Sequence, residues 1–111
     1  MRGFLFPTAK PKDLKFQPLI NGLTGSDVVL SCESTASPVP NVTWINNNID
    51  LWSGKYSIST AVIPGTNKLV TNITVRNASI YDMGYYKCRF WNVHGSTEGT
   101  IKLEVVDGKI I

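Results

Sequence analysis

The 111-residue chain has few of the side chains that metal sites and nucleophilic catalysis use, with two cysteines and one histidine. A structural zinc site needs about four nitrogen or sulfur ligands, often in close pairs such as C-x-x-C. The chain offers only these three side chains, and none of them forms such a pair. The sequence therefore excludes a structural zinc site and indicates no cofactor.

Long hydrophobic runs are also absent. No window reaches 18 consecutive apolar residues, which excludes a membrane span and direct membrane insertion of this segment. The apolar stretch at residues 3–7 is too short for the core of a signal peptide, and no small-residue cleavage site follows it. We therefore expect either a cytosolic protein or a piece of a longer secreted or membrane-anchored one.

Positive charge is confined to the N-terminal end. The net charge is +3, and residues 1–15 alone hold four basic side chains against one acidic. The remaining 96 residues carry seven of each sign, so the body of the chain has no net field that would attract phosphate, and we expect no nucleic-acid partner. We interpret residues 1–13 as a linker or disordered arm, 14–107 as one domain and 108–111 as a tail.

Catalytic constellations are weak. The single histidine, His94, lies beside Ser96 in a short turn, where sequence neighbours rarely reach the geometry of a catalytic triad. The G-x-S-x-G motif and glycine-rich phosphate loops are missing. The sequence therefore favours a protein that is not an enzyme.

Short alternations of apolar and polar residues are what the chain does contain. They occur in five segments, each with one apolar and one mostly polar face, at 27–33, 41–46, 68–76, 85–91 and 99–105. Turn residues separate them, as in an all-β sandwich or barrel. One apolar face per strand is what a strand covered by a second sheet requires.

Three residues with inward parity stand out: Cys32, Trp44 twelve positions later, and Cys88. In a small secreted domain the two cysteines would form one disulfide, whereas in the cytosol they would be buried thiols. A second motif, D-x-G-x-Y-x-C, is formed by Asp82, Gly84, Tyr86 and Cys88. The spacing of both motifs resembles immunoglobulin domains of the I-set, as found in cell-adhesion molecules and receptor ectodomains.

The resemblance implies a two-sheet antiparallel immunoglobulin-like β-sandwich with an inter-sheet disulfide between Cys32 and Cys88, on which Trp44 packs. It further implies that the Tyr86 hydroxyl bonds to nearby backbone and that Lys55 pairs with Asp82. One residue departs from the I-set pattern, since Phe90 stands where a small side chain is usual, so a smaller residue must lie opposite it.

Three N-x-[ST] sequons are present, about twice the number expected by chance. They make Asn41, Asn72 and Asn77 candidate glycosylation sites. We expect Asn72 to lie on the outer side of one sheet, and Asn41 and Asn77 to lie near the two ends of the sandwich.

Strand parity also gathers aromatic and basic residues on one outward surface, and these residue types dominate binding hot spots. The candidate partner-binding residues are Ile45, Tyr85, Lys87, Arg89, Trp91 and Lys102. The alternative is that Trp91 is covered by its own neighbours, such as the segment around Trp52.

We therefore expect an extracellular protein–protein recognition module, in a secreted or cell-surface ectodomain, with another immunoglobulin-domain protein or a second copy as its partner. The resemblance also implies adjacent immunoglobulin or fibronectin-type modules in the parent chain. Two alternatives remain: an intracellular structural I-set module of a giant muscle protein, and a secreted immunoglobulin-type ligand-binding protein.

Overall fold

The computed structural model of the chain describes residues 7–52 and 54–107. Along these residues run nine strands and one short 3₁₀ helix: β1 (Ala9–Phe16), β2 (Leu19–Leu23), β3 (Val28–Ser37), β4 (Asn41–Asn46), β5 (Ile49–Leu51), β6 (Tyr56–Val62), β7 (Lys68–Val75), η1 (Ile80–Asp82), β8 (Gly84–Asn92) and β9 (Gly95–Val106).

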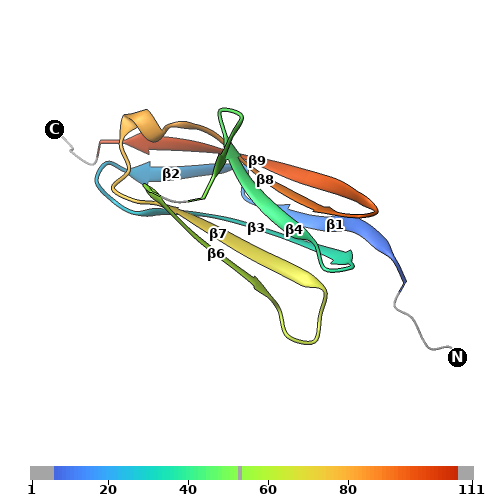
Figure 1. Cartoon of the computed structure of the whole chain (residues 1–111). Coiled ribbons are helices and arrows are strands. Elements are labelled where there is room, and N and C mark those ends of the chain that lie inside the picture. The colour runs from blue at the N-terminus through green and yellow to red at the C-terminus, as the bar shows by residue number, and fades with distance from the viewer. Residues whose placement is uncertain (1–6, 53, 108–111) are drawn as a thin grey trace, which may run out of the picture.

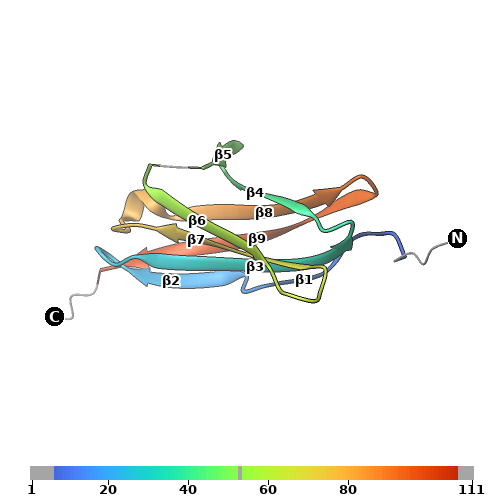
Figure 2. The ribbon, with the colours of Figure 1, turned by 60° about the horizontal axis from the view of Figure 1, so that its bottom comes forward.

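The strands form two sheets that lie face to face, as Figures 1 and 2 show. One sheet has the order β1-β3-β7-β6 and the other the order β2-β9-β8-β4-β5. Neighbouring strands are antiparallel except β2, which pairs in parallel with β9. The predicted all-β, two-sheet sandwich is confirmed, with one parallel pair at its margin.

The core lies between the sheets and follows the predicted alternation. On β7 every second residue is buried, and the same holds along the whole of β3 and for residues 86–90 of β8. The buried residues that pack together include Leu30, Trp44, Ile73, Tyr86, Phe90, Ile101 and Leu103. Alternation alone therefore selects the inner face of each central strand.

A covalent bond and a hydrogen bond join the sheets through this core. Cys32 on β3 and Cys88 on β8 form the predicted disulfide, with their Cα atoms 6.5 Å apart. Trp44 is buried, and its indole Nε1 donates to the Thr71 hydroxyl on the opposite sheet at 2.9 Å. The Thr71 hydroxyl in turn lies 3.0 Å from the Thr60 hydroxyl of β6, so the polar atoms of this interior are paired.

Phe90 is fully buried despite its departure from the I-set pattern. Strands β3 and β8 run in the same direction on facing sheets, so the residues that follow Cys32 lie level with those that follow Cys88. Ser34 and Ala36 are the buried residues at that level of β3. Both side chains are small, as expected of the residues opposite a phenylalanine at this position.

The expected boundary between a linker at 1–13 and a domain at 14–107 does not match the structure. Strand β1 begins at Ala9, which pairs with Ser37 of β3. Two register shifts interrupt this pairing, and Asp13 has a φ of 52°, so the strand lacks the two-residue period that would identify it in the sequence. Residues 1–6 and the expected tail at 108–111 lie outside the described residues.

Candidate protein-binding face

The outward surface of β4, β8 and β9 carries the predicted partner-binding residues. Four of them alternate along β8, and the register places Ile45 of β4 opposite Lys87 and Lys102 of β9 opposite Tyr85. The structure thus brings all six onto one surface, here called the binding face: Ile45, Tyr85, Lys87, Arg89, Trp91 and Lys102.

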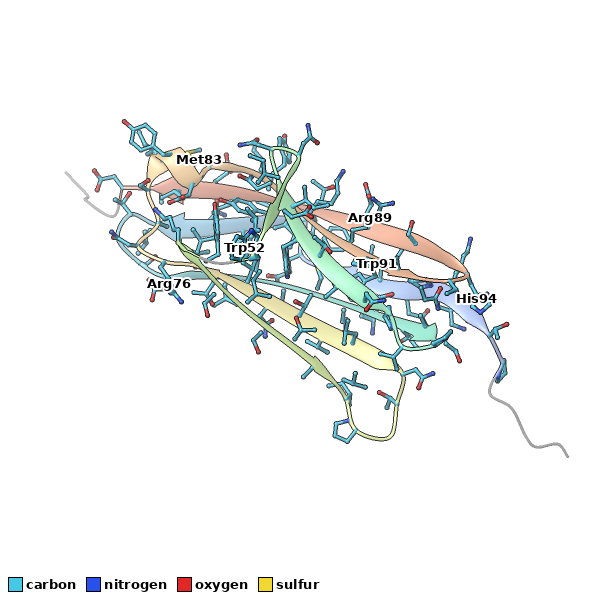
Figure 3. All side chains as sticks on the ribbon, viewed as in Figure 1. Trp52, Arg76, Met83, Arg89, Trp91 and His94 are labelled. Carbon is cyan, nitrogen blue, oxygen red and sulfur yellow. A yellow bond between two sulfur atoms is a disulfide. The ribbon has the colours of Figure 1, made fainter. Side chains whose placement is uncertain are left out.

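Trp91 is open to solvent on this face. Its residue is 39% exposed, and Trp52, the residue expected to cover it in the alternative interpretation, is 79% exposed. Figure 3 shows the two indoles well apart, while Arg89 and Trp91 follow each other along β8. Trp52 therefore does not cover Trp91.

A hollow of about 410 Å³ lies beside Trp91. Apolar, cationic and anionic groups meet in it, because Ile45, Arg89 and Asp50 all line it. The other lining residues are Thr43, Trp91, Asn92, Gly95 and Ser96. An open hollow with an aromatic wall and both charges fits a protruding amphipathic side chain of a protein partner.

A second, smaller hollow of about 200 Å³ lies on the other side of Ile45. Tyr85 and Lys87 line it together with Asn47, Asn48 and Thr100. Because Ile45 lines both hollows, its side chain forms the ridge between them. The face thus offers two adjacent depressions instead of a flat surface.

Two of the three cations on the binding face have carboxylate partners on β9. Lys87 Nζ lies 3.1 Å from Glu98 Oε2, and Lys102 Nζ lies 3.7 Å from Glu104 Oε2. No ion pair of Arg89 is found among the residues that the structure describes. Its planar guanidinium, with five N–H donors, is therefore available to a carboxylate of a partner.

The signature residues lie at one end of the sandwich, where their contacts serve the fold: Asp82, Gly84 and Tyr86. The Tyr86 hydroxyl donates to the Asp82 carbonyl at 2.8 Å, as the resemblance implies. Burial raises the pKa of the Tyr86 hydroxyl, with smaller contributions from Tyr56 and Asp82. Gly84 has a φ of 143°, a conformation that a Cβ would strain.

The predicted pair between Lys55 and Asp82 is confirmed, with Lys55 Nζ 2.7 Å from Asp82 Oδ2. The same carboxylate oxygen accepts the backbone N–H of Ser79 at 2.8 Å, which completes a capping box on η1. Lys55 precedes β6 and Asp82 precedes β8, so this ion pair links the two sheets.

The three sequons fall in different places. Asn72 is on the outer side of β7, where its Oδ1 accepts a hydrogen bond from the Ser31 hydroxyl. Asn77 is exposed in the turn before η1, with a φ of 48°. Asn41 lies opposite Trp91 in the β4–β8 register, so a glycan there would stand on the binding face and not merely near one end.

Other classes of site receive little support from the geometry. Within residues 7–52 and 54–107, no group of three or more His, Cys, Asp or Glu side chains is placed to hold a metal ion. Nor does this part of the chain contain a helix with the length and hydropathy needed to cross a membrane. His94 lies exposed in the turn between β8 and β9, far along the molecule from Met83 in Figure 3.

Sequence reasoning missed the contribution of β5 to the binding face. Asp50 comes from this strand, whose three residues are too few to show alternation. A local signal was nevertheless present. Asn47 and Asn48 follow Asn46 in a short polar run, and this run is flanked by the apolar residues Ile45 and Ile49. Both asparagines have positive φ, at 53° and 62°, as the two central residues of a type I′ hairpin turn require.

Among known protein families, the chain matches a model described as "Immunoglobulin domain" over residues 11–92. Among curated proteins, the slow-type myosin-binding protein C of Homo sapiens is 32% identical over 80% of this chain and 8% of its own length. Immunoglobulin superfamily member 10 of Homo sapiens is 35% identical over 75% of this chain and 3% of its own length. The chain thus spans a small fraction of these two relatives.

Among solved structures, a chain in the crystal structure of Dpr2 Ig1-Ig2 in complex with DIP-Theta Ig1-Ig3 superposes with a TM-score of 0.81 and 26% identity. The match covers 89% of this chain and 33% of that one. Both sheets of the sandwich are therefore shared with a chain crystallised in a complex of immunoglobulin-domain proteins.

Proposed function

The chain belongs to the immunoglobulin-domain family, and from that premise we propose that it is an extracellular protein–protein recognition module that binds through the face of β4, β8 and β9. Members of the family are typically binding modules without enzymatic activity. The observation that carries the proposal is the exposed Trp91 beside Arg89, at the rim of a hollow of about 410 Å³. Tryptophan, tyrosine and arginine are the residues most enriched in binding hot spots.

The compartment is proposed from the cysteines and the sequons. Cys32 and Cys88 form a disulfide, and disulfides persist in oxidising environments outside the cytosol. Asn41 and Asn77 are exposed, and Asn72 is on an outward-facing side of its sheet. Together these features support a secreted or cell-surface ectodomain.

The partner is proposed to be another immunoglobulin domain or a second copy of this one. The similar chain was crystallised in a complex between two immunoglobulin-domain proteins, which supports a partner of this type. The small share of each relative that the chain spans supports neighbouring modules in its parent protein.

A structural module of a muscle protein is the second candidate, because relatives of the chain include both cell-surface adhesion proteins and intracellular muscle proteins. In that setting the cysteines would be reduced and the sequons unused. A secreted ligand-binding protein is a variant of the first candidate, with the same face in use.

The intact mass of native material separates the extracellular from the muscle candidate. It is measured with and without alkylation, which counts free thiols, and before and after N-glycosidase digestion, which detects glycans. Two alkylated thiols and no glycan would overturn the extracellular proposal.

The binding face is tested with a panel of multimerised immunoglobulin-domain ectodomains that includes this chain. We expect Trp91→Ala to weaken binding to the member that responds by about 2 kcal/mol, the size of a hot spot, or roughly 30-fold. The matched control is Val29→Ala, because Val29 is 51% exposed on the outer side of the other sheet. A Trp91→Ala variant that folds and binds like wild type would make the turn around His94 the better candidate.

Asn41 supplies a second control on the same panel. Because Asn41 lies opposite Trp91, a glycan on Asn41 would cover part of the surface around the hollow. Asn41→Gln should therefore leave binding unchanged or strengthen it. Weaker binding by this variant would mean that the partner contacts the glycan and not the bare face.

A further inference from the structure

Strand β6 ends the four-stranded sheet, and one side of its backbone faces outward from the sheet. Figure 1 shows it along the lower margin of the sandwich, next to β7 only. The N–H of Ile63 donates to the Lys68 carbonyl at 2.9 Å, and that of Arg76 to the Lys55 carbonyl at 3.2 Å. In an antiparallel pair of strands, every second residue exchanges hydrogen bonds with the neighbouring strand. Counting from these two bonded pairs, the odd-numbered residues of β6 bond to β7. The N–H and C=O groups of the even-numbered ones face outward: Tyr56, Ile58, Thr60 and Val62.

The two edge strands of this sheet, β1 and β6, differ in their protection against pairing with a further strand. Edge strands are usually protected by lysines, prolines or bulges. Strand β1 has all three, with Pro11 and three lysines in its sequence and two shifts in its register. Strand β6 has none of them, because no charged residue occurs from 56 to 67, the first proline is Pro64, and its pairing with β7 runs without a shift.

We propose that β6 is a self-association edge, through which two copies of this chain join their four-stranded sheets in antiparallel fashion. A two-fold interface brings the same edge of both copies together, so that residue i of one copy contacts residue j of the other and j contacts i. An edge that carries charges of one sign would therefore repel itself, and an uncharged edge would not. An edge without charge thus fits a second copy, whereas a charged partner would find no complementary group on it.

The alternation also fixes the register of this interface. If the two-fold axis passes beside Ser59, the outward-facing residues pair with each other, Tyr56 with Val62 and Ile58 with Thr60 of the second copy. This arrangement forms about eight backbone hydrogen bonds. Ser59 then faces its own counterpart on the outer surface of the combined sheet.

Asn72 lies next to this axis, because it pairs with Ser59 in the β6–β7 register. In the paired state two glycans on Asn72 would stand about 15 Å apart, three strand spacings, on one surface. Branched glycans held that close on one surface crowd each other. Self-association is therefore expected of the chain with a bare Asn72, and a glycan there prevents it.

The test is the mass of the disulfide-bonded, unglycosylated chain in solution, measured by sedimentation equilibrium from about 10 μM to 1 mM. We expect the average mass to rise from 12.2 kDa towards twice that value. Ser59→Lys places two like charges at the axis without touching the core, and should raise the dissociation constant at least tenfold. A wild-type chain that stays monomeric throughout would overturn the proposal.

The matched control is Ser96→Lys, the same substitution at an exposed position beside the hollow of the binding face. It should leave association through β6 unchanged, whereas it would weaken any association of two copies through the binding face. If Ser96→Lys disrupts the dimer and Ser59→Lys does not, the copies associate through the binding face, and the β6 edge is not used. The two surfaces are thus tested separately.

Val62→Pro is a second variant that adds no charge. The N–H of Val62 faces outward and is not part of the ladder with β7, so the proline removes a donor only from the new interface. It should also weaken self-association, with an unchanged far-UV circular dichroism spectrum.

The blocking role of the glycan has its own test. The glycosylated wild-type chain should stay monomeric, and its Thr74→Ala variant, which lacks the Asn72 sequon, should dimerise. Equal association of both would overturn the blocking role of the glycan.

Discussion

The central strands β7 and β8 have similar inner faces and very different outer ones. Both bury every second side chain against the same core. On its outer side β7 presents Lys68, Val70, Asn72 and Thr74, none of them aromatic, whereas β8 presents Tyr85, Lys87, Arg89 and Trp91. Packing explains the inner residues of both strands, but no core contact requires a tryptophan and an arginine on the outer side of β8.

The comparison teaches that the two sheets share one core but offer different outer surfaces. The five-stranded sheet offers a hollowed face with aromatic and charged side chains. The four-stranded sheet offers a sequon and an unprotected edge at β6. If the sheets are as independent in function as this suggests, their outer surfaces should respond separately to substitution, while the links between them should determine stability.

The largest effect is expected from removing the covalent link between the sheets. Cys32→Ala combined with Cys88→Ala opens a loop whose ends are 56 positions apart. The chain-entropy model gives such a loop about 4 kcal/mol of stabilisation, so the free energy of unfolding should fall by about that amount. Guanidinium denaturation of both proteins measures it. A loss below about 1 kcal/mol would mean that the core alone holds the sheets together.

Much of this sheet arrangement was predictable, because alternation is a local property of the sequence. The five alternating segments all became strands, and the inward parity of Cys32 and Cys88 led to the disulfide through the family resemblance. The Lys55–Asp82 pair was predicted in the same way. Where a strand is regular and covered on one side, its residues identify its inner face.

Strands β1, β2 and β5 and the hollows of the binding face were not predictable, because they depend on strands that are irregular, very short or paired with a distant partner. Strand β1 is interrupted by register shifts, and β5 has three residues. Strand β2 pairs in parallel with β9, a choice of partner that its own residues do not encode. The depth of the binding face depends on Asp50 and Asn47 from the β4–β5 hairpin, so the residues were predicted but the hollows were not.

An intermediate effect is expected at Tyr86, where β8 enters the core. Tyr86→Phe removes the hydrogen bond to the Asp82 carbonyl and should lower the free energy of unfolding by about 1–3 kcal/mol at neutral pH. Burial raises the pKa of this hydroxyl in the folded state, whereas the unfolded chain ionises near pH 10. The stabilisation is thus fully present below about pH 10 and is lost as the pH rises above it towards the raised pKa of the folded state.

Urea denaturation between pH 8 and pH 11 checks this dependence. The difference in unfolding free energy between wild type and Tyr86→Phe should shrink above about pH 10. Tyr85→Phe is the matched control on the adjacent residue, because Tyr85 is 61% exposed and should leave the wild-type pH dependence in place. A constant difference across the range would contradict the assignment to Tyr86.

The smallest effect is expected from the ionic link between the sheets. Lys55 and Asp82 lie 2.7 Å apart, but the lysine is 38% exposed, so solvent screens much of the attraction. Lys55→Gln should cost about 0–1 kcal/mol, because Asp82 keeps its bond from the Ser79 N–H. A double-mutant cycle with Asp82→Asn, run at low and high salt, should give a small coupling energy that salt reduces.

Lys87→Gln is the comparison on the outer surface, since Lys87 is equally exposed and its partner Glu98 is 46% exposed. Its cycle with Glu98→Gln should give a still smaller value, because neither carboxylate oxygen there is shielded as Asp82 is. Equal coupling at both sites would mean that the partial burial of Asp82 does not strengthen the inter-sheet pair, and that the sheets are held by the disulfide and the core.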